Sequence, residues 1–148
     1  MALADDIRIF SQAPVFCDLP EDALRLVAFG AERKSLVQGQ VLFQEGAPAE
    51  SAYIVVSGEI GVHAAGRREI EAVAGPGALL SELALITRVE RKFTAVAQND
   101  AAVVRITRAL FRRLLEEYPQ AAQVVEDRIR DNIARLAAEA GAMQPRFS

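Results

Sequence analysis

The sequence predicts a mainly β fold with flanking α-helices, and three observations along the chain support this prediction. Apolar residues recur at helical spacing over the first thirty-odd residues and again after Thr107. Between about residues 35 and 106 the chain instead shows short apolar runs separated by glycines, a pattern typical of a small antiparallel sandwich or barrel. With 148 residues and neither a linker nor an internal repeat, we expect a single domain over residues 1–148.

Two helices are expected before the β region. The first carries Ile7, Ile9 and Phe10 near one face and ends before Pro14. The second opens at Pro20, which is followed by two acidic residues and so suits the first turn of a helix. Gly30 is its expected end, because glycine is favoured just past a helix C-terminus.

Six apolar runs are the expected strands of the β region, and the glycines between them are expected to mark turns. The runs are Val41–Phe43, Tyr53–Val56, Ile60–Val62, Glu69–Val73, Thr94–Ala97 and Val103–Ile106. The glycines are Gly39, Gly46, Gly58, Gly66, Gly75 and Gly77. Residues 81–86 interrupt this pattern with helix formers, so we expect one or two helical turns there, entered directly from residues 75–77 and capped by Ser81.

Two more helices are expected after Thr107. The first ends at Tyr118, because the residue before a proline disfavours the α conformation, and Pro119 starts a long helix to about Ala140. The apolar face of the first is formed by Leu110, Phe111, Leu114 and Leu115. The apolar stripe of the second is formed by Val125, Ile129, Ile133, Leu136 and Ala140.

Composition and single residues exclude several classes of function. Cys17 and His63 are the only cysteine and histidine, so neither a multi-cysteine zinc site nor a histidine metal cluster can form. We interpret His63 as a partly exposed strand residue and expect no catalytic site, metal or cofactor. The acidic N-terminus lacks the basic start of a secretory signal, and no run approaches about 18 apolar residues, so we expect no membrane span and a cytoplasmic location.

The charge distribution argues against nucleic-acid binding. The formal net charge is −3, opposite in sign to what a phosphate backbone attracts. A local basic cluster near the end of the β region is diluted by two glutamates, so we interpret it as a solvated helix face. The cluster consists of Arg105, Arg108, Arg112 and Arg113.

Ser81, Glu82 and Arg91 have the chemistry of an anion-binding site. A helix that begins at Ser81 offers free N–H groups and a positive dipole end. The planar fork of Arg91 suits a phosphate, and Glu82 accepts hydrogen bonds from a ligand hydroxyl. A ligand that carries both groups fits this set. From spacing alone, the alternative is that Glu82 and Arg91 pair on the surface of a turn.

These residues lie within a longer pattern. It consists of Gly39–Gly46, Tyr53–Ile60, Gly75–Leu85, Arg91 and Thr94. In this order and spacing the segments resemble the cyclic nucleotide-binding domain family, as in bacterial catabolite-activator regulators, protein kinase A regulatory subunits and gated channels. The resemblance runs from about residue 16 to residue 136. It implies an eight-stranded antiparallel, jelly-roll-like β-roll over about residues 35–106, with C-terminal helices over about residues 107–140 and a phosphate-binding cassette at residues 81–86.

The resemblance also implies roles for individual positions. Glu82 would hold the ribose 2′-hydroxyl, and Arg91 would neutralise the cyclic phosphate. Backbone amides near Leu83 and Ala84 would add donors. Thr94 falls where many members have threonine.

Further positions correspond to the wall and lid of the family's ligand site. Leu80 and Val55 are candidate wall residues. The long C-terminal helix would act as a lid over the base, with Ile133 and Leu136 as lid candidates, and as the seam of a homodimer. Leu136 and Ala137 align with polar base-contacting positions of the catabolite-activator type, so those hydrogen bonds would be absent.

Four positions depart from the family pattern. Ser81 replaces the usual glycine before the glutamate, which would crowd the ribose or require a different backbone angle. Glu90 replaces a proline and brings a negative charge towards a phosphate. Lys92 replaces a small residue, and Phe93 replaces an alanine and would narrow the pocket if it points inward. We count Ser81, Lys92 and Phe93 among the ligand-binding candidates.

The resemblance therefore implies a cyclic AMP or cyclic GMP sensor or regulatory module without catalytic activity, acting on an unidentified effector protein. The alternative is a degenerate member of the fold that works through protein contacts or dimerisation. A DNA-binding regulator is not expected, because about eight residues after Ala140 are too few for a recognition domain.

Overall fold

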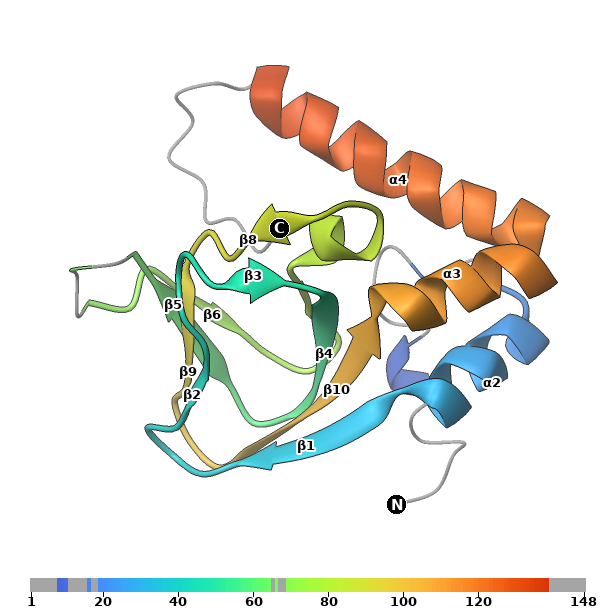
Figure 1. The fold of residues 1–148 in the computed structure, drawn as a ribbon. Coiled ribbons are helices and arrows are strands. Elements are labelled where there is room, and N and C mark those ends of the chain that lie inside the picture. Colours follow the sequence, from blue (N-terminus) through green and yellow to red (C-terminus); the bar gives the residue numbers. More distant parts are fainter. Residues whose placement is uncertain (1–7, 11–15, 17–18, 65, 67–68, 139–148) are drawn as a thin grey trace.

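The computed structural model describes residues 8–10, 16, 19–64, 66 and 69–138, and it shows a β region with helices at both ends of the chain (Figure 1). Residues 8–10 are helical, and α2 (Glu21–Gly30) precedes the β region. The helices α3 (Arg108–Glu117) and α4 (Pro119–Ala138) follow it. These bounds confirm the predicted helices, except that Ile7, Pro14 and residues 139–140 lie outside the described residues.

The described residues form ten strands and one short 3₁₀ helix, η1 (Glu82–Leu85). The strands are β1 (Glu32–Leu36), β2 (Val41–Phe43), β3 (Pro48–Ala49), β4 (Ser51–Ser57), β5 (Ile60–His63), β6 (Ala72–Ala74), β7 (Leu79–Leu80), β8 (Val89–Glu90), β9 (Thr94–Ala97) and β10 (Ala101–Thr107). A mainly β fold is thus confirmed, but a count of eight strands is not. The helical turn after residues 75–77 is also not entered directly, because β7 intervenes.

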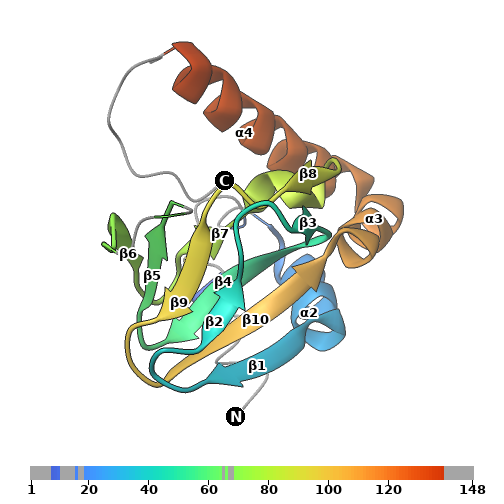
Figure 2. The same ribbon diagram turned by 60° about the vertical axis from the view of Figure 1, so that its left-hand side comes forward.

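The strands pair antiparallel in two four-stranded sheets and one two-stranded ribbon (Figure 2). One sheet has the order β1-β10-β4-β7 and the other has the order β2-β9-β5-β6. The ribbon pairs β3 with β8. This arrangement agrees with the β-roll that the resemblance implies.

Residues of β4 and β10 alternate between two apolar cores, because successive side chains of a strand point to opposite faces. Ile54 and Val104 pair across the two strands and lie in a core shared with the helices, here called the helical core. Val55 and Val103 also pair, and they lie in a core between the two sheets, here called the roll core. The two central strands therefore serve both cores.

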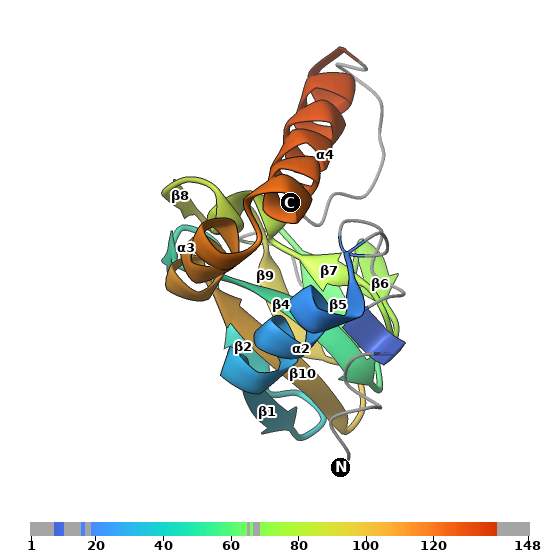
Figure 3. The same cartoon turned by 90° about the vertical axis from the view of Figure 1, so that its right-hand side faces the viewer.

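Helices α2 and α3 pack against the helical core, while the end of α4 projects away from the sheets (Figure 3). Thr107 caps α3, since its Oγ1 accepts a hydrogen bond from the amide of Leu110 at 3.0 Å. Val125 and Ile129 of α4 are buried, as their place on the apolar stripe predicts. None of the described helices is both long enough and apolar enough to cross a membrane.

Candidate functional site

Arg91 lies between β8 and β9 and is buried, with 6% of its surface exposed. Its Nη1 donates a hydrogen bond to the backbone oxygen of Ser51 at 2.8 Å, and its Nη2 donates to Ser51 Oγ at 3.3 Å. Its guanidinium carbon lies 4.4 Å from the ring centroid of Phe43 and 5.5 Å from that of Tyr53. These contacts leave N–H groups of the guanidinium for a ligand, because an arginine side chain carries about five N–H donors.

The partners recorded for Arg91 in the described part of the chain include no carboxylate. Burial lowers the pKa of Arg91 from its ordinary value, with a smaller upward effect from Tyr53 and a smaller downward effect from the nearby Arg105. Arg105 donates from Nε to the same Ser51 hydroxyl at 3.2 Å. Burial also excludes the alternative in which Arg91 forms an ion pair on the surface of a turn.

Ser81 precedes η1 in a left-handed conformation, with φ 62° and ψ 43°. It is the only non-glycine residue with positive φ among the described residues. Ser81 occupies the N-cap position of η1 as predicted, but its side chain makes no capping hydrogen bond. The backbone instead keeps the angle for which glycine is suited, although the residue has a side chain and is 5% exposed.

The cassette residues after Ser81 differ in their burial. Leu80 and Ala84 are buried, whereas Glu82 and Leu83 are half-buried. The amide of Ala84 donates to the backbone oxygen of Ser81 at 3.0 Å. The predicted donor at Ala84 is therefore already engaged within the chain.

The residues after Arg91 alternate across the strand. Phe93 is buried in the roll core, and its ring centroid lies 5.6 Å from that of Phe43. Lys92 is exposed on the other side. Thr94 is half-buried, and its Oγ1 accepts a hydrogen bond from the amide of Glu45 at 3.0 Å. Phe93 thus points inward, which is the case in which the sequence predicts a narrower pocket.

An open groove of about 500 Å³ lies where the ribbon meets the start of β9. It is lined by Glu45, Gly46, Val89, Glu90, Arg91 and Lys92. Glu90 is exposed in β8, where it pairs with Pro48. Arg91 therefore reaches this groove from a buried position while two glutamates stand at its rim.

A second groove, of about 450 Å³, separates the cassette from α4. It is lined by Leu83, Ile86, Thr87, Arg130 and Ala134. The lid candidates Ile133 and Leu136 belong to α4, but their side chains lie outside what the structure describes. Their role as a lid stays a prediction.

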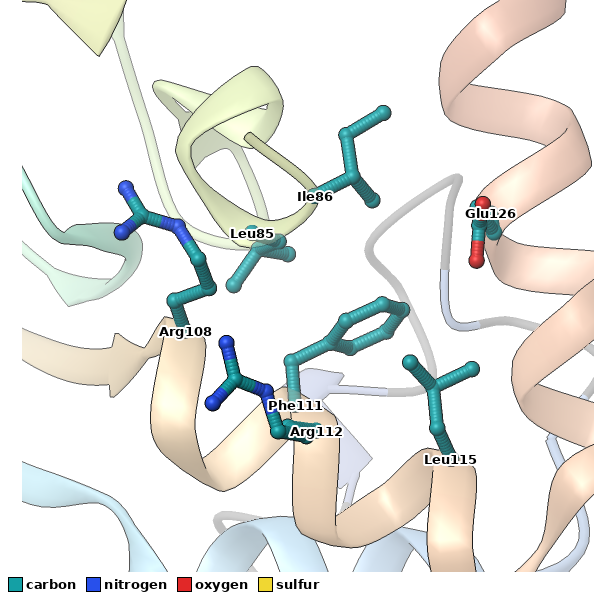
Figure 4. Close-up of a pocket in the computed structure, with 7 residues that line it drawn as sticks. All are labelled: Leu85, Ile86, Arg108, Phe111, Arg112, Leu115 and Glu126. Carbon is teal, nitrogen blue, oxygen red and sulfur yellow. The ribbon is translucent and has the colours of Figure 1, made fainter. Parts of the chain in front are cut away.

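Arg108 connects the cassette to the C-terminal helices. Its Nε donates to the backbone oxygen of Ala84 at 2.9 Å, and its Nη2 donates to that of Ala49 at 2.7 Å. Figure 4 shows Arg108 with Arg112 beside a small cavity of about 90 Å³ between η1, α3 and α4. The interpretation of the basic cluster as a solvated face is therefore wrong for Arg108, although Arg112 and Arg113 are exposed.

Four residues that contribute to the site were missed by sequence reasoning. They are Phe43, Ser51, Tyr53 and Arg108. The contacts of the first three with Arg91 join positions about 40 or more residues apart, which no local pattern reveals. An inward-facing aromatic at Phe93 was the one available signal that the surroundings of Arg91 are aromatic.

Comparisons with known proteins agree on one family. The family model for the cyclic nucleotide-binding domain matches residues 33–118. The cyclic AMP receptor protein of Thermus thermophilus is 31% identical over 109 residues, which cover 69% of this chain and 50% of that protein. Lysophospholipase NTE1 of Chaetomium globosum is 32% identical over 96 residues, which cover 63% of this chain and 6% of that protein. The chain thus spans at most half the length of these two relatives.

A solved structure from Brucella abortus, of a cyclic nucleotide-binding-like protein, is 45% identical with a TM-score of 0.69. The match covers 76% of this chain and 98% of that one. The family model spans more than half of the 148 residues. The chain belongs to the cyclic nucleotide-binding domain family.

Proposed function

We propose that the chain binds a cyclic nucleotide, cyclic AMP or cyclic GMP, and acts as a sensor or regulatory module without catalytic activity. The observation that carries this proposal is the buried Arg91, whose recorded partners in the described residues include no carboxylate. A buried charge is costly unless it is paired, and a phosphate next to the cassette supplies the missing negative charge. The name of the Thermus thermophilus relative, a cyclic AMP receptor, supports the same ligand class.

In this proposal Arg91 donates its remaining N–H groups to the phosphate. Glu82 accepts from the ribose hydroxyl, and the apolar side chains of Leu80 and Val55 form part of the wall. In this proposal the cassette and α4 have two arrangements. The ligand binds one arrangement more tightly than the other, and binding therefore shifts the chain towards it. No described side chain supports a preference for adenine over guanine.

Calorimetric titration with cyclic AMP and with cyclic GMP tests the proposal. The protein is first denatured and refolded, so that any co-purified nucleotide is removed. We expect a dissociation constant in the micromolar range for one of the two, equivalent to about −8 kcal/mol. Absence of heat and of a thermal shift at millimolar concentrations of both ligands contradicts the proposal.

The variant Arg91→Met tests whether Arg91 binds the phosphate of the nucleotide. We expect it to weaken nucleotide binding by more than about 100-fold, since hydrogen bonds to charged groups contribute about 1.5–3 kcal/mol each. The fold should persist, because methionine keeps the apolar bulk of the side chain and removes a buried charge that is costly when it is not paired. Arg112→Met, which removes an exposed arginine of α3, is the matched control and should bind as the unaltered protein does.

The second candidate is a degenerate module that acts through protein contacts. Two observations favour it: the buried side chain of Ser81 where the family has glycine, and the ring of Phe93 inside the roll core. Both take up volume near the cassette. A protein that is folded yet binds neither nucleotide supports this candidate, and a search for a protein partner follows from that result.

The finer expectations remain proposals. We propose a homodimer through α4, an effector protein as the partner and a cytoplasmic location. The organisation of residues 1–148 as one domain is proposed in the same way. A similar segment also occurs in a relative named as a lysophospholipase. For this chain we propose binding without catalysis, and the anion site at Arg91 is the basis of that proposal.

A further inference from the structure

Within the described part of the chain, the recorded partners of the Arg91 guanidinium are Ser51 and two aromatic rings, and they include no carboxylate. The guanidinium carbon lies 4.4 Å from the centroid of Phe43 and 5.5 Å from that of Tyr53. Both distances fall within the roughly 6 Å over which a cation is attracted to a ring face. All three residues are buried, and the attraction is stronger where water is excluded.

The ring of Phe43 packs against two other aromatic rings. Its centroid lies 5.8 Å from that of Tyr53, with an interplanar angle of 27°, and 5.6 Å from that of Phe93, with an angle of 47°. Phe93 follows Arg91 by two residues, so both side chains face the interior of the roll. We call Phe43, Tyr53 and Phe93 the aromatic cluster.

We infer that Phe43 is the positioning residue of the anion site, whose ring face holds the Arg91 guanidinium in place of a carboxylate counter-ion. Phe93, which stands where the family usually has alanine, packs against that ring at a tilt. This inference rests on the proposed function, because it explains how the site stays ready for a phosphate.

A carboxylate counter-ion and an aromatic ring would affect the Arg91 guanidinium differently. A carboxylate would occupy the in-plane N–H groups of the guanidinium, which are the groups that a phosphate also needs. A ring face attracts the cation through its quadrupole and leaves those N–H groups to Ser51 and the ligand. The incoming phosphate then displaces no competing anion.

Graded fluorination of Phe43 tests the ring face without changing the shape of the core. Fluorine withdraws electrons from the ring face and weakens its attraction for a cation. We expect 4-fluorophenylalanine at position 43 to weaken cyclic nucleotide binding by a few-fold and 3,4,5-trifluorophenylalanine to weaken it by about tenfold. Equal dissociation constants across the series, in a protein that binds nucleotide, overturn the positioning role.

A matched control separates this role from general packing. Phe111 is buried in the helical core, and none of its ring contacts recorded in the described residues involves Arg91. The same fluorinated residues at position 111 should leave nucleotide affinity within about twofold of the unaltered protein. An equal loss of affinity at both positions assigns the effect to packing and overturns the inference.

A second measurement needs no nucleotide and so separates this inference from the proposed function. Arg91→Met, Phe43→Leu and the double variant are compared by urea unfolding of the ligand-free protein. We expect their effects on the unfolding equilibrium constant to depart from additivity by about tenfold, because the two side chains interact directly. Additivity within about twofold contradicts the contact. If neither cyclic nucleotides nor inorganic phosphate bind, the proposed function fails while this cycle still decides the role of Phe43.

Discussion

Ser81 holds a backbone conformation that the resemblance assigns to glycine. Its φ is 62° and its ψ is 43°, and a left-handed conformation costs a residue with a Cβ atom roughly 1–2 kcal/mol. No capping hydrogen bond of the side chain offsets this cost. The residue opens the cassette, so the strain is located where the ligand is proposed to bind.

Ser81→Gly should therefore stabilise the protein. Glycine removes the left-handed penalty but adds roughly 0.5–1 kcal/mol of chain entropy to folding, so we expect a net gain of about 0.5 kcal/mol in the free energy of unfolding. Urea unfolding measures the difference. Ser81→Ala is the control, since it retains the Cβ atom and should bring no gain. Equal stabilisation by both variants contradicts the assignment of strain to the backbone.

The sequence and the resemblance pointed to Arg91 and residues 81–86 as candidates, but not to the residues that surround the Arg91 guanidinium. Arg91 could be placed because its spacing from Glu82 is local and because the resemblance covers both. Ser51 and Phe43 could not be placed, because their contacts with Arg91 arise only when β2, β4 and the start of β9 meet in space.

At the scale of secondary-structure elements, Arg108 joins three of them. It is the first residue of α3, and its amide donates to the backbone oxygen of Glu50 at 2.9 Å. Its side chain donates to Ala84 in η1 and to Ala49 in β3. These hydrogen bonds tie the cassette to α3, the helix that precedes α4.

Removal of this connection should loosen the cassette. In Arg108→Met the carbonyl oxygens of Ala84 and Ala49 lose charge-assisted hydrogen bonds, which contribute about 1.5–3 kcal/mol each. We expect faster amide hydrogen exchange over residues 82–87, because local opening becomes less costly. Hydrogen exchange read by mass spectrometry makes the comparison, with Arg112→Met as the control on the same helix. Unchanged hydrogen exchange in both variants shows that the hydrogen bonds of Arg108 do not hold η1 in place.

The predictability of an element depended on its local apolar pattern. The helices α2, α3 and α4 and the strands β2, β4, β5, β9 and β10 lie on the predicted apolar segments. Strand β1 (Glu32–Leu36) was not predicted, because only Leu36 is apolar in that run. Strands β3, β7 and β8 each have two residues, and pairing with a distant partner defines them rather than any local pattern. The resemblance implied eight strands, whereas the described residues form ten, three of which have only two residues each.

At the scale of the whole molecule, the two cores are linked through shared strands. Neighbouring residues of β4, such as Ile54 and Val55, are both fully buried but belong to different cores. Strand β10 alternates in the same way. Neither core can lose its packing without exposing one face of β4 and β10, so we expect the described region to unfold as one unit.

This expectation is tested by weakening each core separately. Ile60→Ala opens the roll core and Leu114→Ala opens the helical core, and each should cost about 2–5 kcal/mol. Circular dichroism follows the helices, and tyrosine fluorescence follows Tyr53 in the roll core once Tyr118 is replaced by phenylalanine. We expect both probes to report the same urea midpoint in each variant, lowered together by either substitution. If Leu114→Ala lowers only the dichroism midpoint, the cores unfold independently, and a ligand held at the roll could not be sensed at α4 through packing that the two share.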